Sequence, residues 1–206
     1  VIKIEPEAGD PSRLWGPFAG HIEDKERSLF WIYYNTGKKS VTLDIYSEEG
    51  KASLKKLAAE ADVIIETLKP GKMAELGLGY EEIKAVNPKI VYCSITSFGQ
   101  TGPYAQWNAS SDMIPFALAG NMNESGMPGF CYMPLNMGRN FTNNATGIYT
   151  AVAILAYVRR AAETGEGAYI DSAVMEAAAL WRNEAIADPQ RFPYQKDRKK
   201  TGSAGP

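Results

Sequence analysis

The feature that most constrains the fold is an alternation of short apolar runs and amphipathic helical patterns between residues 40 and 96. The runs DVIIET (62–67) and KIVYCSIT (89–96) are rich in β-branched residues, which suits strands covered on both faces of a parallel sheet. Before the first of them, the segment GKASLKKLAAEA (50–61) places leucine and alanine on one helical face and lysines on the other. The order β-α-β-α-α-β predicts an α/β fold with a parallel sheet and right-handed crossovers.

Other segments carry weaker signals of the same kinds. Ser47 is placed to cap the helix of the amphipathic segment. A long helix is predicted over residues 142–162, and the Gly- and Pro-rich segment 97–112 is predicted to be a long loop of the kind that often carries function. Further strands are predicted at residues 1–5, 30–35 (FWIYYN), 40–46 and 168–171, and further helices at residues 70–77, 80–88, 113–122 and 172–187.

Composition excludes several classes of protein. The chain is 45% hydrophobic and 22% charged with a net charge of −2, which argues against nucleic acid as a partner. No apolar run approaches the roughly 18–20 residues that cross a bilayer, so we expect a cytoplasmic protein without a membrane partner. We also expect the chain to be a fragment, because the apolar run VIKIE begins at its first residue.

Cysteine and histidine usage restricts the chemistry. Cys93 and Cys131 lie far apart in apolar settings, which favours buried free thiols over a metal or redox pair. His21 is the only histidine, so neither a histidine-based triad nor a multi-histidine metal site fits the sequence. We therefore expect no metal.

Ligands of open parallel sheets bind beyond the carboxyl ends of the strands. The turn ETLKPGKM has Lys69 and Lys72 flanking a Pro-Gly pair at a helix start, which suits a phosphate as well as it suits a solvated corner. The turn NTGKKS (35–40) poses the same choice, with a plain turn favoured. Asp112 precedes a predicted helix, where N-capping alone would explain it. Neither GxGxxG nor GxxxxGK[ST] is present.

A series of motifs nevertheless occurs in order along residues 1–180. They are VIKIEP-EAGDPSR, N-x-x-K-x-S-V-x-L-D, ADVIIETLKPG, MAELGLGYEEIKAVNPKIVYCSITSFGQTGPY and ATGIYTAVAILAYVRRAAETGEGAYIDSAVMEA. Together they resemble the class III CoA-transferase family, the formyl-CoA and carnitine CoA-transferase group. The resemblance implies a Rossmann-like domain that binds coenzyme A (CoA) and two protomers threaded through each other like links.

The resemblance also implies a domain organisation. We expect a partial large CoA-binding domain over residues 1–187, without the family's first strand and helix, and the start of a linker toward a small domain over residues 188–206. The implied reactants are an acyl-CoA and a carboxylic acid. The implied assembly is a homodimer or a heterodimer with a paralogue.

In this family an aspartate carboxylate attacks the donor thioester, and CoA is then exchanged through a mixed anhydride and an enzyme thioester. The aspartate stands four residues before a glycine, in the pattern D-x-x-x-G, at the turn that enters the long helix. Counting back from Gly147 leads to Asn143, and the neighbouring position is Asn144. An uncharged amide cannot replace the carboxylate, because its nitrogen lone pair is delocalised.

Three explanations of Asn143 remain open: a non-catalytic subunit paired with a catalytic paralogue, an introduced Asp-to-Asn change, or a diverged homologue with another role. The related α-methylacyl-CoA racemases use a histidine immediately before the position of Asp112, where this chain has Ser111. A racemase is therefore expected less than a transferase.

The resemblance to the family is only partial at the expected CoA contacts. Glu75 replaces a basic residue of many members, and Ala109 stands where some have lysine. Tyr104 and Trp107 fit the acid pocket and simple loop packing equally well. The positions matching CoA neighbours are Leu43, Thr67, Leu68 and Leu76, with Lys69 and Lys72 available for phosphates.

Overall fold

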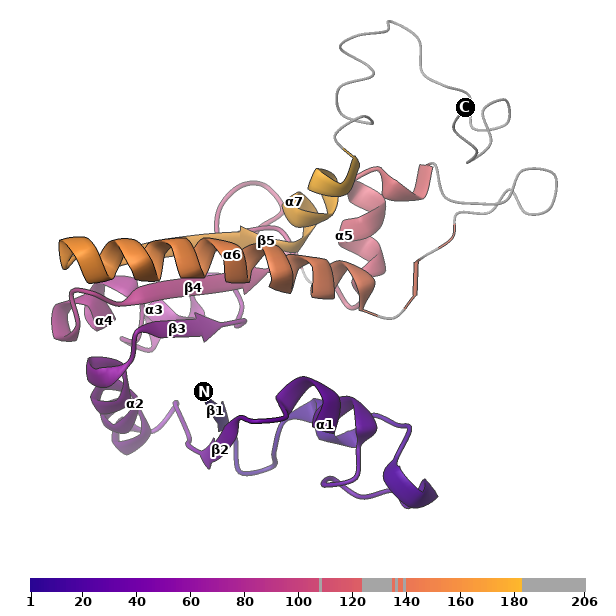
Figure 1. The fold of residues 1–206 in the computed structure, drawn as a ribbon, viewed down its shortest axis with the longest axis horizontal. Helices are drawn as coiled ribbons and strands as arrows, with labels where there is room; N and C mark the ends of the chain where they lie inside the picture. Colours follow the sequence, from indigo (N-terminus) through magenta and orange to yellow (C-terminus); the bar gives the residue numbers. More distant parts are fainter. Residues whose placement is uncertain (108, 124–134, 136, 139, 183–206) are drawn as a thin grey trace, which may run out of the picture. The chain divides into compact units, whose positions relative to one another are not determined.

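The computed structural model describes residues 1–107, 109–123, 135, 137–138 and 140–182. The chain divides into two compact units, Val1–Lys56 and Leu57–Pro206 (Figure 1). Within the described part of the chain, no helix has both the length and the apolar character that crossing a membrane requires.

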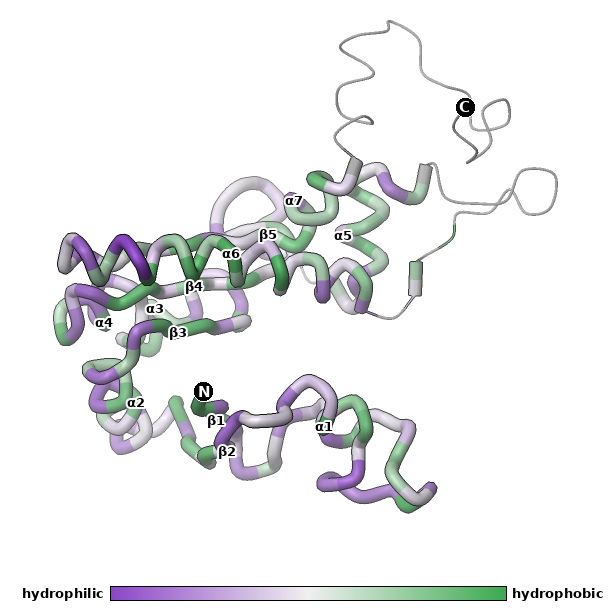
Figure 2. Tube along the Cα trace, in the orientation of Figure 1, coloured by the Kyte–Doolittle hydropathy of each residue, from purple (hydrophilic) through white to green (hydrophobic). Residues whose placement is uncertain are grey.

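A three-stranded parallel sheet forms the centre of the second unit. Its strands are β3 (Val63–Glu66), β4 (Val91–Thr96) and β5 (Ala168–Ala173), in the order β3-β4-β5. The register pairs Glu66 with Ser94 and Ser94 with Asp171, so the strands end at a common edge. The predicted α/β fold with parallel strands is confirmed. The central strand β4 is buried on both faces over its first four residues, as its composition predicts, whereas Ile65 of the edge strand β3 keeps 57% of its surface exposed. Figure 2 shows the apolar character of β3.

One face of this sheet packs against the long helix α6 (Phe141–Thr164), which runs beside β4 and β5 (Figure 1). Val91 and Cys93 of β4 meet Ile154 and Ala161 of the helix, and all four are buried. Three threonines one turn apart, Thr142, Thr146 and Thr150, are also buried on α6. The last of them shares a hydrogen bond of 2.7 Å with the Ser172 hydroxyl on β5, so the helix is held to the sheet by apolar and polar contacts.

Two short helices, α3 (Lys72–Glu75) and α4 (Tyr80–Val86), lie between β3 and β4 in the chain, and Tyr80 at the start of α4 packs against Tyr92 on the opposite face of the sheet. Tyr92 alternates with the neighbours that face α6, and its hydroxyl donates a hydrogen bond of 3.1 Å to the Leu78 carbonyl. The rings of Tyr80 and Tyr169 lie 5.5 Å apart on this side, and Ile83 is fully buried. The expected helices at 70–77 and 80–88 are therefore present but shorter.

Short helices complete the second unit: α5 (Met113–Leu118), α7 (Val174–Ala179) and the 3₁₀ turns η3 (Asn121–Asn123) and η4 (Leu180–Arg182). The buried Asn121 amide donates a hydrogen bond of 3.0 Å to the Ala178 carbonyl, which joins η3 to α7. The predicted helix over 172–187 begins two residues later than expected, and its part beyond residue 182 lies outside the described residues.

In the first unit, β1 (Ile2–Glu5) pairs in parallel with β2 (Lys39–Thr42). The short 3₁₀ helices η1 (Pro11–Leu14) and η2 (Ala19–His21) follow β1, and α2 (Glu48–Glu60) crosses the boundary between the units. The expected cap is confirmed, since the Ser47 hydroxyl accepts the Gly50 N–H at 3.0 Å.

The prediction of a strand at residues 30–35 is wrong. This segment belongs to the helix α1 (Leu29–Asn35), whose first turn is capped by Ser28, because the Ser28 hydroxyl accepts the Trp31 N–H at 3.1 Å. Of the seven residues of α1, only Trp31 is buried. The Arg13 guanidinium lies over the Trp31 ring, 3.9 Å from the ring centroid. A run of aromatic residues has strand propensity, but here the cap and this single anchor decide for the helix.

Candidate functional site

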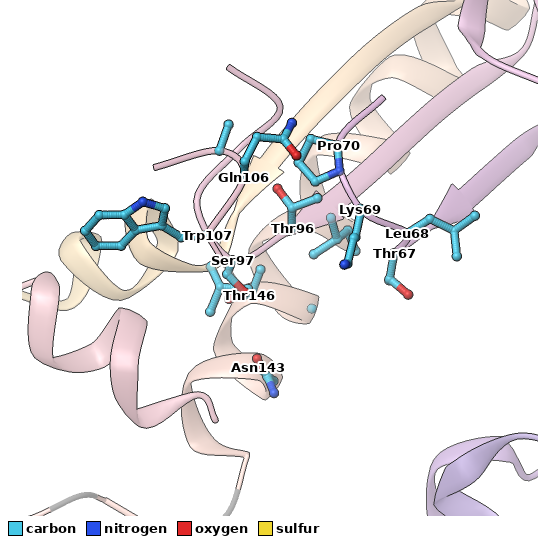
Figure 3. A pocket seen from close by; sticks show the side chains of 14 residues that line it. Thr67, Leu68, Lys69, Pro70, Thr96, Ser97, Gln106, Trp107, Asn143 and Thr146 are labelled. Atoms are coloured by element: carbon cyan, nitrogen blue, oxygen red, sulfur yellow. The ribbon is translucent and has the colours of Figure 1, made fainter. Parts of the chain in front are cut away.

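A pocket opens where the strands of the second unit end, the position at which parallel sheets bind ligands. Its volume is about 430 Å³, within the range of small-molecule sites. Three segments supply most of the wall: the turn after β3, the loop after β4 and the start of α6 (Figure 3). The lining residues are Thr67, Leu68, Lys69, Pro70, Ile95, Thr96, Ser97, Ala105, Gln106, Trp107, Asn143, Thr146, Gly147 and Val174.

The turn after β3 is held in place by two hydrogen bonds. The Glu66 carboxylate accepts the Leu68 N–H at 2.7 Å, and the Gln100 side chain accepts the Gly71 N–H at 3.2 Å. Burial raises the pKa of Glu66 above its usual value, while hydrogen bonds from Ser94 and Leu68 act against this rise. The turn thus presents Thr67, Leu68 and Lys69 to the pocket on a fixed backbone.

The loop after β4 supplies an aromatic wall. The Trp107 ring lies 4.4 Å from the Tyr104 ring and 6.4 Å from the Phe98 ring, measured between centroids. Phe98 is buried, whereas Trp107 keeps 57% of its surface exposed. The prediction that 97–112 forms an irregular loop is confirmed for its described residues, and the loop contributes Ser97, Ala105, Gln106 and Trp107 to the pocket.

The start of α6 brings Asn143 and Gly147 to the pocket on one face, since they lie one turn apart. The helix begins at Phe141, so Gly147 is helical. The family pattern had placed this glycine in the turn that enters the helix, and that expectation is wrong. A Cβ atom added at Gly147 would meet no atom within 4 Å, so this glycine leaves free space beside Asn143. Asn143 lies in the first turn, where free N–H groups and the helix dipole favour negative charge.

The pocket thus brings Asn143 together with three of the predicted CoA contacts, Thr67, Leu68 and Lys69. Lys72 and Leu76 do not line it, and the Lys72 ammonium lies 2.9 Å from the Glu75 carboxylate in an ion pair. Leu43 belongs to the Val1–Lys56 unit and stays a prediction.

Asp112 stands at the N-cap position of α5, but the capping role expected of its side chain is wrong. The Asp112 side chain makes no capping hydrogen bond, and its buried Oδ2 has no hydrogen-bond partner. The Ser111 hydroxyl instead accepts the Met113 N–H at 3.2 Å, because Asp112 itself has helical backbone angles and its carboxylate cannot reach back to the first turn.

Cys93 is a buried free thiol, as expected, and burial raises its pKa to about 11, so it stays protonated at neutral pH. Cys131 lies outside the described residues. Over the described ranges, no group of three histidine, cysteine, aspartate or glutamate side chains is arranged to hold a metal ion. The fourteen residues that line the pocket include no carboxylate, and their only charged member is Lys69.

Sequence reasoning missed several lining residues. Thr96 ends β4 and Ser97 opens the loop 97–112, so the position of this strand end could have identified both residues. Thr146 and Val174 come from α6 and from the first residue of α7, and nothing in the local sequence marks them.

Comparison with known proteins gives a consistent picture. The chain is 42% identical over 180 residues to a succinate–glutarate CoA-transferase of Agrobacterium fabrum, covering 85% of this chain and 44% of that protein. It is 32% identical over 205 residues to the succinyl-CoA–L-malate CoA-transferase beta subunit of Chloroflexus aurantiacus, covering 98% and 48%. The chain therefore spans a little less than half the length of these curated relatives.

A solved structure agrees with the sequence comparisons. The crystal structure of a CAIB/BAIF family protein from Brucella suis matches with a TM-score of 0.85 and 36% identity, over 96% of this chain and 51% of that one. The family model of CoA-transferase family III matches residues 1–206. With the whole sequence matched by the model and the fold shared with a solved relative, the chain belongs to CoA-transferase family III.

Proposed function

We propose that the protein binds CoA thioesters at this pocket and serves the transfer of CoA between carboxylic acids. The observation that carries the proposal is the convergence of Asn143 with Thr67, Leu68 and Lys69 on one pocket. Asn143 is 74 or more positions away from the other three residues in the sequence. The resemblance assigns position 143 to the family's attack on the thioester and the other three positions to the binding of CoA.

The pocket has suitable chemistry for such a ligand. CoA carries anionic phosphates, and Lys69 offers an exposed cation at the turn after β3. Figure 3 shows Asn143 below Ser97 and Thr146, with Lys69 and Leu68 to one side. A thioester held near Asn143 could therefore direct its phosphates past Lys69 toward solvent.

The lining without a carboxylate favours a second candidate: a non-catalytic CoA-binding subunit whose partner supplies the aspartate. One relative is itself named as a beta subunit. A racemase has less support, because Ser111 stands in place of the family's histidine and its hydroxyl is engaged by the Met113 backbone. We further propose a homodimer or a heterodimer with a paralogue, a cytoplasmic location, and a reaction without a metal.

Calorimetric titration of CoA into the complete protein tests the binding half of the proposal. Lys69→Gln is expected to weaken CoA binding about fivefold, since one hydrogen bond to a charged phosphate is lost at an exposed site. Lys89→Gln is the matched control, because Lys89 is also exposed but precedes β4, at the other end of the strand. Equal affinities of all three proteins, or no binding by any of them, contradict the assigned CoA site.

Hydroxylamine trapping separates the two candidates. The complete protein is incubated with an acyl-CoA and hydroxylamine, which captures an activated acyl group on the enzyme as a hydroxamate. CoA binding without any adduct on this chain supports the subunit role, whereas an adduct on a residue of the pocket supports catalysis by this chain.

A further inference from the structure

The least explained residue of the pocket is Trp107. Its large apolar ring lines the pocket, yet 57% of its surface remains exposed. Trp107 is not among the residues that the family resemblance assigns to CoA binding. An exposed tryptophan gains little from folding at its free face, so that face is available to a ligand.

Two other aromatic rings of the same loop pack against the Trp107 ring. Tyr104 packs against it at a centroid distance of 4.4 Å with an interplanar angle of 50°, and the buried Phe98 meets it edge-on at 6.4 Å. Tilted and edge-on contacts of this kind are favourable between aromatic rings and restrict how far the indole can turn. The pocket wall at Trp107 is therefore preformed.

The position of Trp107 indicates which part of a ligand it would touch. In the view of Figure 3, Trp107 lies on one side of Thr96, Ser97 and Asn143, and the Thr67–Lys69 turn lies on the other. If the phosphates of CoA lie at Lys69 and the thioester lies near Asn143, as in the function proposed above, the acyl group continues toward Trp107. Ala105, which is buried, adds apolar surface beside it.

We propose that Trp107 is a specificity-determining residue that selects acyl-CoA substrates with an apolar segment directly after the thioester, such as an alkyl chain of three or more carbons or an aryl group. This inference rests on the proposed function, because it assumes that CoA binds at the Lys69 side. Each methylene group packed against the indole adds about fourfold to affinity when it is fully removed from water.

The test uses the complete protein and a ladder of propionyl-, butyryl-, valeryl- and hexanoyl-CoA, with free CoA as the reference. In the wild type, Kd is expected to fall about two- to fourfold per methylene. In Trp107→Ala this dependence should flatten to less than about 1.5-fold per methylene while the Kd of free CoA changes less than about twofold. Trp107→Phe should restore part of the dependence, because it keeps an aromatic wall.

Two controls separate recognition from folding. Tyr157→Ala removes another partly exposed aromatic residue of the same unit, which does not line the pocket, and should leave the ladder unchanged. Thermal unfolding should show Trp107→Ala folded, since most of the indole surface is already exposed.

The outcomes test the role of Trp107 separately from the proposed function. An unchanged chain-length dependence in Trp107→Ala, or an equal loss of affinity for free CoA, overturns the role of Trp107. Normal binding of free CoA by a wild type without chain-length dependence also overturns it but leaves the proposed function standing. A wild type that does not bind CoA at all removes the proposed function and this inference together.

Discussion

Asn143→Asp returns a carboxylate to the position that the family resemblance assigns to the nucleophile. The substitution is nearly isosteric, and the Asn143 side chain is exposed and lines the pocket, so no repacking is needed. The restored carboxylate could attack a thioester carbon and expel CoA as thiolate, which is the step that an amide cannot perform.

The magnitudes follow from the position of residue 143 in the first turn of α6. A negative charge there should add about 0.5 kcal/mol to the free energy of unfolding at pH 7, because the free N–H groups and the dipole stabilise it. The same interaction lowers the pKa of the new carboxyl group in the folded state. The gain is therefore complete above the unfolded pKa of about 3.9 and is lost as the pH falls through the lower folded value. For exchange, loss of a nucleophile in other covalent enzymes costs on the order of 10⁶-fold in turnover, about 8 kcal/mol of barrier.

The assay compares Asn143→Asp with Asn144→Asp. Asn144 also lies exposed in the first turn but does not line the pocket, so it should reproduce the gain in stability without any chemistry. Urea unfolding at pH 7 and pH 3 measures the stability of both variants. Isotope exchange between acyl-CoA and free acid measures the transfer reaction, and hydroxylamine captures the intermediate.

The reasoning is refuted if both variants are folded, stabilised and able to bind CoA, and Asn143→Asp still shows no exchange above the wild type in the presence of its partner chains. That result would place the nucleophile elsewhere. A stability gain in Asn144→Asp alone would instead contradict the position of residue 143 within the helix.

Two further predictions concern stability. The Arg13 guanidinium places Nε and Nη2 at 2.8 and 3.0 Å from the two Glu5 carboxylate oxygens. This contact lowers the pKa of the buried Glu5 carboxyl group to about 2. Glu5→Gln should therefore lower the free energy of unfolding of the Val1–Lys56 unit by about 3 kcal/mol at pH 7. Because the folded pKa is depressed, this cost should persist above about pH 4.5 and disappear as the pH falls toward 2, which urea unfolding at several pH values measures; a constant cost at all pH values would contradict the ion pair. Gly147→Ala should raise the free energy of unfolding by about 0.5–1 kcal/mol, because alanine favours the helix and its Cβ meets open space, and it should weaken acyl-CoA binding by occupying part of the pocket. Denaturation and calorimetry check this pair of effects, and a stabilised variant with full affinity would show that the free space beside Gly147 is not used by the ligand.

Much of the fold could be predicted because its signals are local. The apolar runs at β3 and β4 and the long apolar pattern of α6 were placed to within a few residues, since periodicity and β-branched composition act over short distances. The strand prediction at 30–35 was wrong because local signals alone do not decide this segment. Its aromatic residues suit a strand and a helix alike, and the Ser28 cap and the burial of Trp31 decide between them.

The candidate site was predicted only in part. The rule that ligands bind beyond strand ends identified the turns after β3 and β4, and the family resemblance identified Asn143. The polar side chain of Asp112 suggested a cap that its helical backbone angles do not permit. A cap depends on the dihedral angles of one residue, which residue type alone does not fix.

The sequence by itself determined the order of strands and helices from β2 to β4, the family, and the amide at position 143, because each of these depends on local pattern or on the identity of single residues. Only the tertiary structure decided that Lys69, Trp107 and Asn143 share one pocket. These three residues come from separate segments, and their meeting depends on the register of three parallel strands and on the packing of α6 across them. Such contacts are non-local, so no short stretch of the chain encodes them.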